Sequence, residues 1–227
     1  MKILMMSNLF SIFDPHTSIK DTYNWISIII PLILFPKMFW FKPSKLFSAI
    51  KMIIMFLFNE LFNLMNKYNL NNIFFFLVLF YLLVMMNFIG LFPYIFTPTS
   101  HLIISLPLSL SIWLSIMFFN WTKKTNLSFA HLVPLGTPTL LMSFMVIIET
   151  ISNIIRPGTL AIRLSANMIA GHLLLCLLGS TGPNLKNTII IVILLITQIM
   201  LFTLEMAVSI IQSYVFTMLS SLYSNED

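Results

Sequence analysis

Ionisable and amide side chains recur at seven-residue spacing in two parts of the C-terminal half of the chain. The first set is Glu149, Arg156 and Arg163, with Asn153 and Asn167 each four residues from an end member; the second set is Gln198, Glu205 and Gln212, with Ser209 between them. Because an α-helix completes a turn every 3.6 residues, side chains seven apart lie on nearly the same face. Two helices facing each other with such stripes could line a path that protons cross.

Arg163 is the member of these sets with the strongest physical argument behind it. It lies near the middle of a hydrophobic segment, where a charge costs about 2.5–3.5 kcal/mol on insertion scales. A guanidinium stays protonated in proteins, so Arg163 cannot relay a proton. Its position in the middle of the segment favours a functional role over a purely structural one.

For the other candidate residues, a purely structural role remains an alternative. Glu149 or Glu205 could be a lone protonated carboxyl with a hydrogen-bond partner. His172 lies nine residues after Arg163, about half a turn around the helix, and could be a core histidine. Arg156 could reach a lipid headgroup. Small residues beside this stretch, Ala166, Ala170 and Gly171, would let another helix approach closely.

Composition fixes the kind of element that must position these side chains. The chain has 227 residues, of which 59% are hydrophobic and 8% charged, whereas soluble domains carry roughly a quarter charged residues. Apolar runs recur at about the 20 residues needed to cross a membrane, and continuous runs of this kind form helices rather than barrel strands. We therefore expect an all-α integral membrane protein, one domain over residues 1–227.

The apolar runs predict about five membrane helices and one amphipathic surface helix. The expected segments are an N-terminal segment 1–24, a first span 25–41, a surface helix 45–67, spans 72–92 and 102–119, and long, strongly tilted helices 139–178 and 187–223. The 45–67 stretch is assigned to the surface, in preference to a span, because Lys51, Glu60 and Lys67 interrupt it at helical spacing. The last two segments are longer than the membrane is thick, so they must tilt strongly or lie partly along the membrane plane.

The sequence has no pattern typical of a catalytic, cofactor, metal or nucleic-acid site. It lacks metal-ligand spacing, a Gly-rich phosphate loop and a nucleophile–base pair. The single cysteine, Cys176, allows no intrachain disulfide. With the expected topology, seven lysines fall on one side of the membrane and three on the other. The positive-inside rule then places the N-terminus outside and the C-terminus inside.

Several motifs resemble subunit a of F-type ATP synthases over nearly the whole chain. Arg163–Asn167 reads RLSAN and is followed by AGHLL at Ala170–Leu174. Ile148–Ser152, Leu204–Val208 and Ile211–Thr217 are similar to the mitochondrial version of this family.

The resemblance implies two offset aqueous half-channels beside a rotating ring of carboxylate-bearing subunits. Protons would reach the ring by way of His172 and Glu205 and leave along a path lined by Glu149, with Arg163 separating the two paths. Asn167 and Gln212 would also take part in proton translocation. Further residues could line the channels: Asn153, Arg156, Gln198, Ser209 and Tyr214.

The resemblance also implies partners and a location. The partners would be the c-ring, peripheral-stalk and other small membrane subunits, lipid, protons and, in a dimeric synthase, a second complex, but no nucleic acid. The location would be the mitochondrial inner membrane, with the N-terminus toward the intermembrane space and the C-terminus toward the matrix. Two rival readings are a proton-coupled transporter, which predicts inverted repeats that the sequence lacks, and a structural membrane subunit without a proton path.

Overall fold

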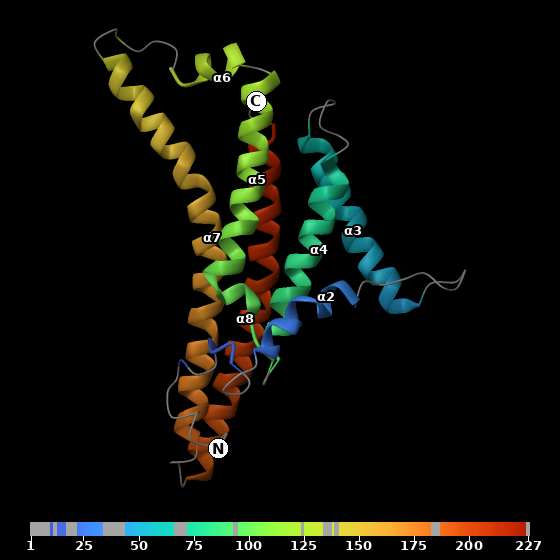
Figure 1. Ribbon diagram of the computed structural model, residues 1–227. Helices are drawn as coiled ribbons and strands as arrows, with labels where there is room; N and C mark the ends of the chain where they lie inside the picture. The colour runs from blue at the N-terminus through green and yellow to red at the C-terminus, as the bar shows by residue number, and fades with distance from the viewer. Residues whose placement is uncertain are drawn as a thin grey trace.

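The described part of the chain is built from helices (Figure 1). The structure, a computed structural model, describes residues 10, 13–16, 22–33, 44–65, 72–92, 95–123, 125–133, 138, 141–182 and 187–225. The helices are η2 (Tyr23–Ile28), α2 (Ile30–Ile33), α3 (Lys45–Leu64), α4 (Ile73–Gly90), η4 (Pro98–Ser100), α5 (Leu102–Lys123), α6 (Thr125–His131), α7 (Met142–Thr181) and α8 (Thr188–Tyr223).

Five of these helices, α3, α4, α5, α7 and α8, are long and apolar enough to cross a membrane by length and composition. The longest are α7, with 40 residues, and α8, with 36. The predicted all-α membrane fold with two long final helices is thereby confirmed. Apolar segments of this kind form helices because an α-helix satisfies the backbone hydrogen bonds within the segment itself.

The structure describes only part of the expected N-terminal segments. In the expected first span 25–41, residues 25–28 belong to η2, Ile29 is a turn and residues 30–33 form α2, while residues 34–41 lie outside the described ranges. The expected surface helix corresponds to α3, which begins where Ser44 accepts a hydrogen bond from the backbone N–H of Phe47 at 3.3 Å. Its assignment to the membrane surface stays a prediction.

The interior combines apolar side chains such as Leu83 and Phe216 with small hydroxyl residues, while many other large apolar side chains face outward. Ser209 and Ser213 of α8 are completely buried, and Ser105 and Ser109 of α5 nearly so. The Ser209 hydroxyl donates to the Met206 carbonyl within its own helix at 2.7 Å. In lipid there is no hydrophobic gain from burying large apolar groups between helices, so small residues that permit close approach are favoured.

Polar contacts hold α8 against α4 and α3. The Asn87 side-chain amide of α4 donates to the carbonyl oxygen of Ser209 at 3.4 Å, and Asn87 is completely buried. Nearer the C-terminus, the Tyr214 hydroxyl donates to the Glu60 carboxylate of α3 at 2.9 Å. The Asn225 amide donates to the Leu64 carbonyl at the end of α3. These contacts fix α8 along its C-terminal half.

Helix α7 contains a proline, Pro157, close to its midpoint. Proline donates no backbone hydrogen bond, so the carbonyl of Asn153 loses its helical partner and the helix can bend there. Figure 1 shows the N-terminal half of α7 leaning away from α5, while its C-terminal half runs beside α8. The bend therefore separates the part of α7 that carries Glu149 from the part that carries Arg163.

Gly90, the last residue of α4, allows a close turn toward η4. A Cβ placed on Gly90 would lie 2.8 Å from the Thr97 Cγ2 atom, and Thr97 is 1% exposed and cannot move aside. We expect Gly90→Ala to destabilise the protein by about 1–3 kcal/mol, the usual cost of overpacking, seen as a lower melting temperature. Gly182→Ala is the control, since its Cβ would meet no atom of the described residues within 4 Å; equal melting temperatures for the two variants would contradict this packing.

Candidate functional site

His172 of α7 and Glu205 of α8 are two buried proton-binding side chains, and Gly171, next to His172, lies against Glu205; we call them the His172–Glu205 pair. Glu205 is 7% exposed and His172 is 9% exposed. The Glu205 carboxylate packs on the backbone of Gly171, because a Cβ built there would lie 2.7 Å from Oε1 and 2.9 Å from Cδ. The absence of a side chain at Gly171 is what lets this carboxyl lie between the two helices.

Three polar atoms of these two side chains have no hydrogen-bond partner among the described residues. In the part of the chain that the structure describes, both Glu205 carboxyl oxygens and His172 Nε2 are buried without a hydrogen bond. The Phe13 ring packs edge-on against the imidazole, with ring centroids 6.4 Å apart. Buried polar groups are nearly always satisfied, so these atoms are suited to bind a proton or water rather than to hold the helices together.

Arg163 lies on the outer side of α7. Its side chain is exposed, while the next residues, Leu164 and Ser165, are buried against the bundle. Ala166 and Ala170, one and two turns further along, are exposed too and leave a shallow surface beside the guanidinium. A cation in the middle of a lipid-facing helix is costly, so this face is suited to a partner that carries a carboxylate.

The candidates on α7 are arranged on either side of Arg163. Glu149 and Asn153, both half-buried, lie in the leaning N-terminal half of the helix. At 1.5 Å per residue, Glu149 is about 21 Å before Arg163 along the axis and His172 about 14 Å after it. Asn167, half-buried, is one turn from Arg163. Along α7, Arg163 therefore lies between the Glu149 region and the His172–Glu205 pair.

On α8, the predicted stripe is partly turned inward. Glu205 and Ser209 are buried, whereas Gln198 and Gln212 are half-buried. The Gln198 amide nitrogen lies 3.9 Å from a Cβ placed on Gly179, so this residue also faces α7. Asn87, which was not among the predicted site residues, supports the stripe through Ser209. The sequence feature that could have identified Asn87 is its position as an amide side chain within an otherwise apolar span.

Arg156 contacts an aromatic ring on α8. Its guanidinium carbon lies 4.9 Å from the centroid of the Tyr223 ring, in cation–π geometry. The contact joins the bend of α7, next to the buried Pro157, to the last turn of α8. Arg156 is thus in a position to hold the two helices together.

Variants of Tyr223 test this contact. We expect Tyr223→Leu to lower the melting temperature by an amount equivalent to about 1 kcal/mol, the usual value of a cation–π contact, and Tyr223→Phe to keep it because the ring remains. Thermal unfolding of the purified complex measures both. A Phe variant as unstable as the Leu variant would show that the ring face contributes nothing.

The described residues contain no group of three or more His, Cys, Asp or Glu side chains placed to hold a metal ion. The free thiol of Cys176 is half-buried, one turn beyond His172. What the arrangement offers chemically is proton binding at a carboxyl and an imidazole, together with a fixed positive charge.

Comparison with known proteins agrees with this chemistry. The chain matches the family described as ATP synthase A chain over residues 22–225. It is 54% identical to ATP synthase subunit a of Anopheles quadrimaculatus over 224 residues, which is 98% of this chain and 99% of the relative. ATP synthase subunit a of Drosophila melanogaster is 52% identical over 223 residues, with the same two shares covered. That of Locusta migratoria is 52% identical over 224 residues, again with these shares.

Proposed function

The chain belongs to the ATP synthase A chain family, and from this membership we propose how its own residues pass protons across the membrane. It is the proton-translocating subunit of the membrane sector and carries no catalytic ATP site. It is a multi-pass membrane protein and one subunit of a larger complex. The two alternative functions, solute transport and a purely structural role, are not those of this family.

Proton uptake is assigned to Glu205 and His172. The single observation that carries this assignment is the burial of both side chains on facing helices with no hydrogen-bond partner for the carboxyl oxygens or Nε2 within the described residues. A proton arriving from one side of the membrane binds this pair and passes to a carboxylate of the rotor ring. Gln198, Ser209 and Gln212 continue the polar stripe along α8 and keep water beside it.

Arg163 separates the uptake path from the release path. Its exposed guanidinium attracts a ring carboxylate that has lost its proton, and a group that stays protonated cannot pass a proton on. A ring subunit must therefore carry its proton through lipid for nearly a full turn before release. Asn167, one turn from Arg163, offers an amide hydrogen bond to the same carboxylate, and Ala166 and Ala170 let the ring helix come close.

Proton release is assigned to the region of Glu149. This residue lies on the opposite side of Arg163 from the His172–Glu205 pair, in the half of α7 that leans away from α5 (Figure 1). Asn153, half-buried and one turn further, adds a polar side chain to that path. Arg156 and Tyr214 set the positions of helices through their contacts with Tyr223 and Glu60.

The partners and the orientation follow from the same reading. The c-ring passes the Arg163 face. Peripheral-stalk and other small membrane subunits cover further faces of the chain, and one of these faces contributes to contacts between two complexes in a dimer. The membrane is the mitochondrial inner membrane. The excess of lysines on one side places the N-terminus toward the intermembrane space and the C-terminus toward the matrix.

Replacing Glu205 tests the uptake path. Glu205→Gln keeps the shape of the side chain but cannot take up a proton, so we expect proton flux through reconstituted complexes to fall to that of vesicles without the complex. Glu205→Asp retains a carboxyl and should keep part of the flux. A pH-sensitive dye inside the vesicles measures both rates. Normal flux with Gln would remove Glu205 from the proton path.

A further inference from the structure

An open groove between α3 and α4 lies away from the proton-binding residues. Its volume is about 570 Å³. The two helices pack together at one end, around Leu61, Met65, Ile73 and Phe76, and diverge from there toward the other end (Figure 1). The groove runs along α3 from Phe47 to Asn59 and reaches α4 at Phe74 and Leu77, close to the packed end.

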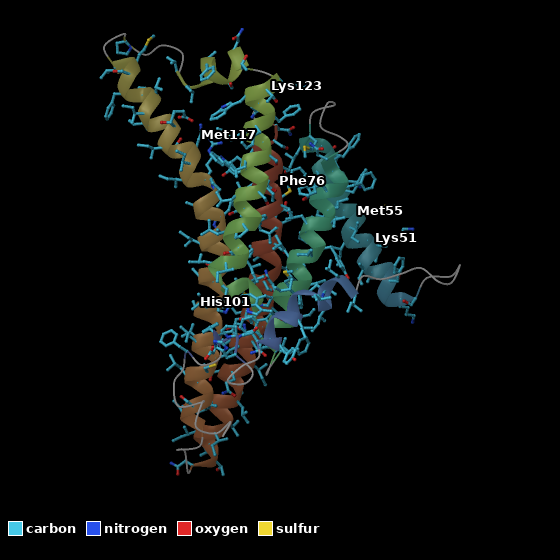
Figure 2. The ribbon with its side chains drawn as sticks, viewed as in Figure 1. Lys51, Met55, Phe76, His101, Met117 and Lys123 are labelled. Atoms are coloured by element: carbon cyan, nitrogen blue, oxygen red, sulfur yellow. The ribbon has the colours of Figure 1, made fainter. Side chains whose placement is uncertain are left out.

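The walls of the groove are apolar apart from a few side chains. Phe58 of α3 and Phe74 and Leu77 of α4 form much of its surface. Lys51 lines it as well, one turn from Met55 on the same face of α3 (Figure 2). Long apolar walls with an ammonium beside them match a ligand that has an aliphatic part and an anionic part.

The charges of α3 place the anionic part at its N-terminal half. Lys45 and Lys51 both lie there, and the positive end of the helix dipole adds to their charge. The carboxylate of the same helix, Glu60, lies in the other half and accepts the hydrogen bond from Tyr214. An anion near Lys51 therefore meets attraction and is kept away from a repelling carboxylate.

The apolar surface beside the groove favours lipid as the occupant. The outer side of α3 next to it is also apolar, with Met52 69% and Phe56 61% exposed, as expected of a helix in contact with lipid.

We propose that this groove binds an anionic phospholipid, with the phosphate at Lys51 and an acyl chain along Phe58, Phe74 and Leu77. This binding is independent of the proton path, because none of these residues belongs to it. The bound lipid fills the gap between α3 and α4 and so holds α3 against the bundle.

Photolabelling of the complete complex in nanodiscs tests the proposal. The probes are phosphatidylglycerol and phosphatidylcholine that carry the same photoreactive acyl chain, and labelled peptides are mapped by mass spectrometry. We expect phosphatidylglycerol to label the α3 and α4 groove segments about fivefold more than phosphatidylcholine, the ratio that one lysine near an anionic lipid provides. Lys51→Gln should abolish this preference, and Met55→Trp, which fills the groove, should lower labelling by both lipids.

The control is Lys123→Gln, which removes a lysine at the end of α5, outside the groove (Figure 2); it should leave the preference intact. Co-purification of each variant with the other subunits reports that it has folded and assembled. Equal labelling by the two lipids would overturn the proposal. So would absence of label from the groove, the result expected if a helix of another subunit covers it.

Discussion

Complexes that carry Arg163→Ala are expected to lose proton-driven ATP synthesis by about 100-fold or more. The guanidinium is the exposed cation near the midpoint of α7, and removing one partner of a charge pair shielded from water costs about 3–5 kcal/mol. Each 1.4 kcal/mol is a factor of ten in an equilibrium or a rate. The measurement is the rate of ATP formation by reconstituted vesicles after a pH jump.

The control for this variant is Lys123→Ala, which also removes one positive charge but lies at the end of α5. It should synthesise ATP at nearly the normal rate. If both variants lost synthesis equally, the effect would come from altered charge or assembly rather than from the position of Arg163. If Arg163→Ala retained normal synthesis, the proposed role of this residue would be wrong.

The second large effect is expected from adding one methyl group at Gly171. The Cβ of Gly171→Ala would lie 2.7 Å from Glu205 Oε1, 2.9 Å from Cδ and 3.2 Å from Cγ. Since the first two distances are below 3.0 Å and the third is tight, the carboxyl group must shift away from α7. We expect proton flux to fall about tenfold or more, because a displacement of about 1 Å in a reacting group can cost about 100-fold in rate.

Gly158→Ala provides a matched control on the same helix. Nothing lies within 4 Å of the Cβ that this change would add, and alanine favours a helix over glycine by about 1 kcal/mol. Its proton flux should therefore be normal. Normal flux in Gly171→Ala, in a complex of normal composition, would mean that the position of Glu205 against Gly171 does not matter for proton transfer.

The sequence predicted the long helices because their signals are local. Continuous apolar runs and the break near Gly182 define α7 and α8 within a few residues. Helix α5 extends to Lys123, four residues past the expected end at Phe119, because no residue there breaks a helix. The seven-residue stripes likewise depend only on helix geometry.

Contacts between distant residues were beyond the reach of sequence patterns. Tyr214 and Glu60 are 154 positions apart, and Asn87 and Ser209 are 122 apart. Which helix faces another is decided by packing of small residues over the whole bundle, and no local pattern records it. For the same reason the sequence indicated that Gly171 permits a close approach without showing that Glu205 is what approaches.

The stripe on α7 shows the same limit. Helical spacing predicts that Arg156 and Arg163 lie on nearly one face, yet Arg163 is exposed whereas Arg156 is half-buried and contacts Tyr223. The bend at Pro157 and the course of α8 together decide which member is covered. Periodicity therefore identified the set of residues, and only the packed helices distinguish their surroundings.

The most direct test of the separating role of Arg163 is a measurement of passive proton flux. The complexes measured have their rotor held by a covalent cross-link to the stator. With Arg163 present, a locked rotor should pass no protons, because uptake and release paths meet only by way of the turning ring. With Arg163→Ala, the locked complex should leak protons down an imposed pH gradient. A locked Arg163→Ala complex that stays as tight as the locked unmodified one would contradict the claim that this guanidinium keeps the two paths apart.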